Sequence, residues 1–126
     1  MLTERQHDFL LLAIFVRLQH ERHAEAGRLV EAARRLGVNS PELAFARAVV
    51  EHLSGNHRAA LEAARSCEVI EPAEMGADAK ALRRIRMRNY IKARAILSLT
   101  GDLDDEARSA LDFYLRMGRR RAERAS

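Results

Sequence analysis

The sequence predicts an all-α protein of about six helices that pack as stacked antiparallel hairpins. Alanine, leucine, arginine and glutamate dominate the 126 residues, and all four are good helix formers. Helix breakers are rare, since the chain contains only two Pro and six Gly. The polar segments between the expected helices are short, so each helix must pack antiparallel to the next one.

The first two helices are expected over residues 4–20 and 23–36. Apolar residues are almost continuous in the first helix, which indicates burial on more than one side. Gly37 follows the second helix and is expected to cap its C-terminus. The second helix carries one apolar stripe, formed by Ala26, Leu29, Val30 and Ala33.

The third and fourth helices are marked by their start signals. Ser40 is an N-cap residue and Pro41 is suited to the first turn, so the third helix should run from there to about Leu53. Asn56 is expected to cap the fourth helix, which must end before Pro72. This helix carries small and apolar residues on one face, namely Ala60, Leu61, Ala64 and Cys67.

The fifth helix is expected over residues 78–99 and is longer than the others. Asp102 should cap a sixth helix over residues 103–117, and acidic residues in its first turn suit the helix dipole. Gly118 is expected to end this helix.

The chain is expected to form one domain over residues 1–118, followed by a basic, disordered tail over residues 119–126. The longest apolar run, Phe9 to Val16, is far shorter than the roughly 20 residues that a transmembrane helix needs. Cys67 is the single cysteine, so an internal disulfide is excluded and a reducing compartment is favoured. We therefore expect a cytoplasmic protein that does not bind membranes.

A repeat of 34 residues relates the second and fourth helices, because similar residues coincide: His23 with His57, Ala26 with Ala60, and Ala33 with Cys67. The stretch Gly55 to Ala64, closed by Pro72, resembles the second half of a tetratricopeptide repeat. In that family a Gly and a ring residue start the second helix, small residues follow where the two helices cross, and a Pro closes the unit. The resemblance implies units at 7–40 and 41–72 and a weaker third one near Gly101.

In stacked hairpins of this family the first helix of each unit lines a concave groove. This register places ten residues in the groove, namely Asp8, Leu11, Phe15, Leu18 and Gln19 from the first unit and Glu42, Phe45, Val49, His52 and Leu53 from the second. Seven of them are expected to form a partner-binding groove: Leu11, Phe15, Leu18, Phe45, Val49, His52 and Leu53. An exposed apolar stripe of this size marks a partner site, and an amphipathic helix is the matching ligand. The alternative is ordinary core, covered by the fifth or sixth helix.

The fifth helix carries a run of basic residues without any acid between Ala79 and Gly101. Such a patch suits an acidic partner or nucleic acid, although Tyr90 is the only aromatic residue available there for base stacking. The alternative is a solvated face balanced by the acids at 102–106. The candidate patch consists of Lys80, Arg83, Arg84, Arg86, Arg88, Lys92 and Arg94.

Catalysis and metal binding are not expected. The pairs His20–His23 and His52–His57 lack a further Cys or carboxylate at metal-ligand spacing. The chain contains no phosphate-binding Gly loop and no nucleophile elbow. Cys67 lies at a small-residue crossing position, which predicts a buried, unreactive thiol. We therefore expect no enzyme, no metal and no cofactor.

The short chain, its few repeat units and its apolar groove resemble the small tetratricopeptide-like chaperones of bacterial type III secretion that hold the needle subunit. This resemblance implies a groove that keeps an amphipathic helix of a secreted, polymerising subunit monomeric, and a small co-chaperone on the N-terminal hairpin. Two alternatives stay open. One is a nucleic-acid-associated regulator that uses helix 80–94 and the Arg-rich tail. The other is a homodimeric scaffold that buries the groove.

Overall fold

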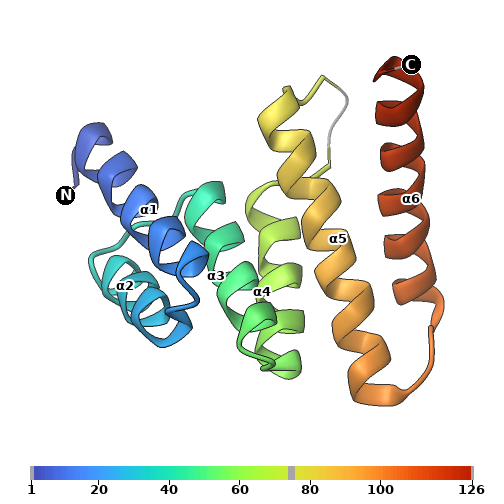
Figure 1. Ribbon diagram of the computed structural model, residues 1–126, viewed down its shortest axis with the longest axis horizontal. Coiled ribbons are helices and arrows are strands. Elements are labelled where there is room, and N and C mark those ends of the chain that lie inside the picture. Colours follow the sequence, from blue (N-terminus) through green and yellow to red (C-terminus); the bar gives the residue numbers. More distant parts are fainter. Residues whose placement is uncertain (1, 74–75, 126) are drawn as a thin grey trace.

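The computed structural model describes the backbone of residues 2–73 and 76–125 and the side chains up to residue 119. This part of the chain forms six α-helices and no strand, so the predicted all-α fold is confirmed (Figure 1). None of the described helices is long and apolar enough to cross a bilayer. The helices are α1 (Glu4–Gln19), α2 (His23–Arg35), α3 (Pro41–Leu53), α4 (His57–Ile70), α5 (Ala79–Thr100) and α6 (Asp105–Ala125).

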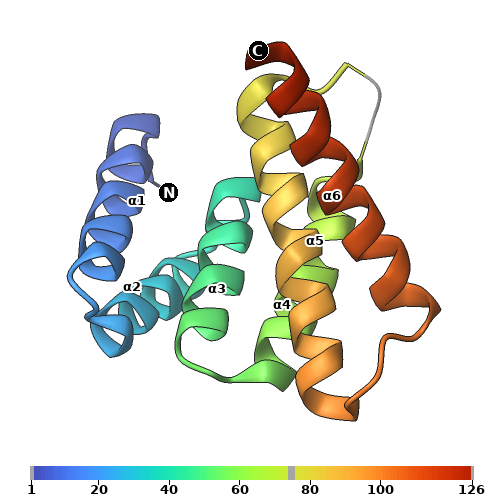
Figure 2. The same cartoon turned by 45° about the vertical axis from the view of Figure 1, so that its right-hand side comes forward.

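The helices form three hairpins, α1–α2, α3–α4 and α5–α6, that stack in chain order (Figures 1 and 2). Each helix packs on the next one, and α3 also packs on α1 and α5. In the described residues the backbone of α1 packs only on α2 and α3, and the backbone of α6 packs only on α5. The two ends of the stack are therefore far apart, and α6 does not cover the N-terminal hairpin.

Local signals set most helix ends as predicted. The Ser40 hydroxyl accepts a hydrogen bond from the Leu43 backbone N–H at 3.2 Å, and Pro41 occupies the first turn of α3. Gly37 ends the α2 turn with a positive φ of 86°, a conformation that favours glycine. Thr3 and Gln6 form a capping box at the start of α1, which the sequence analysis did not anticipate.

Both predicted ends of α6 are wrong. The helix begins at Asp105, and the carboxylate of Asp104 rather than Asp102 accepts the capping hydrogen bond, from the Ala107 N–H at 2.8 Å. The helix also continues through Gly118 to Ala125. Arg, Ala and Glu dominate this last stretch and favour helix, while an internal Gly costs only about 1 kcal/mol.

Gly118 lies beside the Arg86 side chain of α5. A Cβ atom at this position would lie 2.6 Å from Nη2 of Arg86, which reaches across from α5. The Nε–H of Arg86 donates to the Tyr114 carbonyl oxygen at 3.1 Å. Gly118 thus lies within α6, next to a side chain from the neighbouring helix, and does not end the helix.

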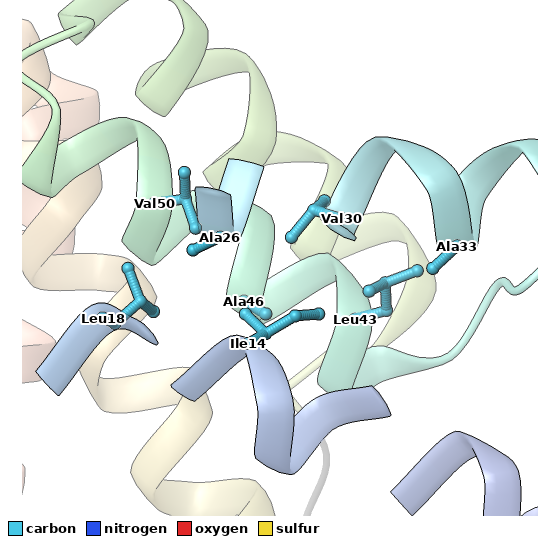
Figure 3. Packing of buried hydrophobic residues seen from close by; sticks show 8 residues of the cluster. All are labelled: Ile14, Leu18, Ala26, Val30, Ala33, Leu43, Ala46 and Val50. Carbon is cyan, nitrogen blue, oxygen red and sulfur yellow. The ribbon is translucent and has the colours of Figure 1, made fainter. Parts of the chain in front are cut away.

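Buried apolar side chains gather in two clusters. The first core cluster joins the first hairpin to α3 (Figure 3) and consists of Ile14, Leu18, Ala26, Val30, Ala33, Leu43, Ala46 and Val50. The second core cluster joins α3, α4 and α5 and consists of Ala48, Ala60, Ala63, Ala64, Cys67, Ile91 and Ala95. Small residues dominate the second cluster, which lets the helix backbones approach closely.

The 34-residue register also matches the structure. Helices α2 and α4 both begin at the histidines of the register, His23 and His57. The small residues predicted at the helix crossings are all buried: Ala26, Ala33, Ala60, Ala63, Ala64 and Cys67.

Replacing Ala60 by Leu should lower the free energy of unfolding by about 1–3 kcal/mol, because the larger side chain overpacks the second core cluster. Ala59 precedes it in α4 and is only partly buried, so Ala59→Leu is the matched control and should change little. Urea unfolding of both variants measures the difference. Equal stability of the two variants would show that Ala60 does not lie at a tight crossing.

Candidate functional site

The residues of the predicted groove lie on two neighbouring helices, α1 and α3. Leu11, Phe15 and Val49 are partly buried and pack against the first core cluster. Phe45 is also partly exposed and belongs to neither core cluster, whereas Leu53 is exposed. We call the surface formed by Leu11, Phe15, Phe45, Val49, His52 and Leu53 the α1–α3 face.

Leu18 does not belong to this face. Its side chain is buried within the first core cluster, where it packs with residues of α2 and α3 (Figure 3). The prediction that Leu18 lines an open surface is wrong. Around the circumference of α1, the side that faces the core adjoins the side that faces the predicted groove. Leu18 lies at the boundary between the two sides, so the repeat register assigned it to the wrong one.

A row of aromatic rings extends the α1–α3 face toward α5 and α6. His52 meets the ring of Tyr90 edge-on at 5.8 Å between ring centroids, and Tyr90 lies 5.1 Å from Tyr114. The guanidinium of Arg86 lies 4.1 Å from the centre of the Tyr114 ring. Sequence reasoning missed this row because its members come from three helices and show no common spacing.

The protonation of His52 suits an apolar surface. Burial lowers the pKa of His52 below its ordinary value, and the positive charge of Arg94 lowers it further. The His52 side chain is therefore neutral at physiological pH. The row from His52 to Tyr90 then presents uncharged rings, with cations at its edges.

The candidate basic patch is not one surface. The guanidinium of Arg84 donates two hydrogen bonds to Glu71, at 3.0 and 2.7 Å, and this partner raises the pKa of Arg84. Lys92 is buried, donates to Glu68 and lies 3.4 Å from Glu106. The helical period of 3.6 residues turns a continuous basic run toward several neighbours at once, which explains the dispersal. Lys80, Arg83 and Arg94 are the members of the patch that stay exposed.

Arg88 has a structural role at the end of α4. Its side chain is only 3% exposed, and its Nη1 donates to the carbonyl oxygens of Cys67, at 3.1 Å, and of Glu71. Glu71 is the C-cap residue of α4, where helix geometry leaves carbonyls without intrahelical partners, whereas the Cys67 carbonyl also accepts from the Glu71 N–H at 2.8 Å. Arg88 thereby caps α4 from α5, beside a hollow of about 320 Å³ between α4, α5 and α6.

Glu106 joins α4, α5 and α6. Its carboxylate accepts two hydrogen bonds from Arg65, at 3.1 and 2.7 Å, and lies 3.4 Å from the ammonium group of Lys92. The hydrogen bonds from Arg65 are the main cause that lowers the pKa of Glu106. Four acids, at 102 and 104–106, were expected to balance the basic residues of α5. Among the described residues, Glu106 is the one of the four that forms an ion pair with α5, through Lys92.

Stability should depend on pH through Glu106. A carboxyl whose folded pKa is lowered stabilises the fold above its unfolded pKa and loses this effect as pH falls through the folded value. Glu106→Gln should therefore reduce the free energy of unfolding at pH 7 by at most about 1 kcal/mol, because the pair is partly exposed. The difference from the parent protein should shrink as pH falls below about 4.3, the ordinary pKa of Glu, and vanish only below the lowered folded pKa.

Urea unfolding at pH 7 and pH 3.5 checks this expectation. Glu62→Gln is the matched control, since Glu62 is exposed and its side chain forms no ion pair among the described residues. A difference between Glu106→Gln and the parent that stays constant down to pH 3.5 would contradict the ionic role.

Cys67 is buried, as predicted. Burial raises the pKa of its thiol to about 11, so the thiol stays protonated at neutral pH and is a poor nucleophile. Among the described residues no group of three His, Cys, Asp or Glu side chains lies close enough to hold a metal ion.

No protein-family model matches this chain, and neither a curated protein nor a solved structure matches it. The α1–α3 face therefore has to be interpreted from the contacts of the chain itself.

Proposed function

We propose that the protein is a non-catalytic binding module that holds an amphipathic helix of a protein partner against the α1–α3 face. The observation that carries this proposal is Phe45. It is a large apolar residue that stays partly exposed, outside both core clusters, on a helix that α6 does not contact. Fully burying an exposed Phe stabilises a complex by about 1.5–3 kcal/mol, and burying the part of Phe45 that is still exposed contributes a fraction of this.

The surroundings of Phe45 support a helical partner. Val49 and His52 lie four and seven residues further along α3, so all three share one side of that helix. Leu11 and Phe15 add a parallel row on α1. Two rows of apolar side chains on neighbouring helices accommodate a third helix between them, with its own apolar stripe turned inward.

A nucleic-acid-associated role has less support. Arg84 and Lys92 are already paired with acids of this chain, and Arg88 is buried. Phosphate binding draws on free cations, of which α5 offers few beyond Lys80, Arg83 and Arg94.

The narrower prediction, a type III secretion chaperone, specifies which protein the partner helix would come from. That helix would belong to a secreted subunit that polymerises, and shielding its apolar stripe would keep the subunit monomeric. The same α1–α3 face would serve, so the proposal of partner holding does not depend on this identity.

A capture experiment tests the proposal. The chain is used as bait in extract of its native host, and its partner is identified and then titrated with the parent protein and with Phe45→Asp. We expect the parent to capture a protein with an amphipathic helix and the variant to lose it while staying folded. Equal capture of the partner by the parent protein and by Phe45→Asp would contradict the proposal.

A further inference from the structure

The hollow of about 320 Å³ between α4, α5 and α6 lies where the second hairpin meets the third. Helix α5 packs on both neighbours, α4 and α6 (Figure 1). Arg88 and Lys92 line the hollow from one side of α5. Ser109, Phe113 and Arg116 line it from one side of α6. The described lining residues are all distinct from those of the α1–α3 face, so the hollow is a separate feature of the molecule.

Arg88 is a buried cation that uses only part of its hydrogen-bonding capacity. Its Nη1 donates to the carbonyl oxygens of Cys67 and Glu71, and no carboxylate of the described residues forms an ion pair with it. Its Nε–H is the one buried side-chain donor in the described part of the chain that lacks a hydrogen-bond partner. Buried cations are normally paired with an anion, because burying an unpaired charge is costly. Arg88 therefore lacks an acceptor of opposite charge.

The acid that lines the hollow does not supply this acceptor. It is Glu68, whose carboxylate accepts a hydrogen bond from the ammonium group of Lys92 at 2.5 Å. Lys92 also lies 3.4 Å from Glu106, so acids of the chain itself already balance its charge. The charges of Glu68, Lys92 and Glu106 are thus committed to one another.

Arg116 adds a second cation on the α6 side of the hollow. Its side chain is exposed and forms no ion pair among the described residues, and this includes Asp112 one turn earlier in α6. The hollow therefore has two cations without an acid partner in the described part of the chain, the buried Arg88 on α5 and the exposed Arg116 on α6.

The rest of the lining indicates which kind of anion fits. Pro72 and Ala73 follow α4, and Phe113 is partly buried on α6, so apolar groups lie beside the two cations. The volume leaves room for more than a bare inorganic anion, since a water molecule takes up about 30 Å³ of liquid water. A guanidinium edge matches the planar geometry of a carboxylate, which can accept two parallel hydrogen bonds from it.

We propose that this hollow is a binding site for a small carboxylate with an aromatic or apolar body. The carboxylate pairs with Arg88, at the guanidinium edge that carries the unpartnered Nε–H, and with Arg116, while the apolar body packs on Phe113. Arg88 already caps α4 from α5. A ligand that links Arg88 to Arg116 therefore also ties α6 to the joint between α4 and α5.

Titration of the full chain with benzoate tests the proposal, with benzamide as the neutral probe of the same shape. Benzoate should bind with a dissociation constant on the order of 1 mM, which is the range that so few atoms allow. It should also raise the melting temperature, because it binds the folded chain. Benzamide should bind at least about tenfold more weakly, since it lacks the charge. In ¹⁵N NMR spectra the Nε–H signal of Arg88 should shift with benzoate.

Two variants assign the binding to the hollow. Arg116→Gln removes an exposed cation, so the fold should persist while the affinity for benzoate falls about two- to fivefold. Arg88→Met removes the buried cation and should abolish binding in the folded protein. Arg83→Gln is the matched control, because Arg83 is exposed on α5 outside the lining of the hollow and should bind benzoate like the parent.

Four results would overturn the proposal. The first is no binding of benzoate at about 10 mM, and the second is equal affinity for benzoate and benzamide. The third is an affinity for benzoate that Arg116→Gln leaves as high as Arg83→Gln does, which would place the site elsewhere. The fourth is tighter binding of inorganic phosphate than of benzoate, which would show that the apolar lining does not select the ligand.

Discussion

Arg88→Met is expected to lower the free energy of unfolding by about 1–3 kcal/mol, and the melting temperature by on the order of 5 °C. The substitution removes both hydrogen bonds that Arg88 donates to the carbonyl oxygens of Cys67 and Glu71. The Glu71 carbonyl loses its donor, and a buried acceptor left without a donor costs about 1–3 kcal/mol. The Cys67 carbonyl still accepts from the Glu71 backbone N–H at 2.8 Å.

Two effects partly offset this loss. Methionine relieves the cost of burying a charged guanidinium, a cost that already lowers the pKa of Arg88. Water can also reach the freed carbonyls through the adjoining hollow. We expect the lost hydrogen bonds to outweigh both effects, because Arg88 is the donor that ties the end of α4 to α5.

Arg83→Met is the matched control for this change. Arg83 lies on the same helix but is exposed, so its replacement should change stability by no more than about 0.5 kcal/mol. Thermal and urea unfolding of both variants give the comparison. If Arg88→Met were as stable as Arg83→Met, the cap on α4 would contribute nothing and the packing at this joint would have to be reconsidered.

Phe45→Asp is expected to weaken partner binding by about 2–4 kcal/mol, which corresponds to roughly 30- to 1000-fold in the dissociation constant. Phe45 lies partly exposed and outside both core clusters in the free chain. A carboxylate there can stay hydrated, so the fold should tolerate it. In the complex the same carboxylate would be buried against an apolar helix without a partner.

Titration calorimetry with the captured partner measures the affinity, and circular dichroism measures the fold. Val69→Asp carries the same charge on an exposed apolar position of α4 and should bind like the parent. Leu43→Asp introduces the charge two residues away into the first core cluster and should unfold the protein. If Phe45→Asp unfolded like Leu43→Asp, the side chain would be part of the core and the proposed binding face would lose its anchor.

Local signals in the sequence were enough to place the helices. The Ser40-Pro41 start of α3, the glycine turn after α2 and the small residues at 26, 60 and 64 all depend on neighbours within a few residues or on a simple period. The 34-residue register located the helix crossings correctly for the same reason. It failed at Leu18, where core and surface meet on one helix.

The sequence by itself determined the all-α class, the hairpin order and the small residues at the crossings, because caps, helical periodicity and residue size act locally. Only the tertiary structure decided which charges on α5 are free. The partners of Arg84 and Lys92 lie 13 and 24 residues away along the chain. Likewise, α6 continues through Gly118, which lies beside Arg86 of α5, and Phe9 and Leu12 are exposed because no described helix packs on that side of α1. A side chain's exposure depends on what packs against it, and local pattern does not contain that information.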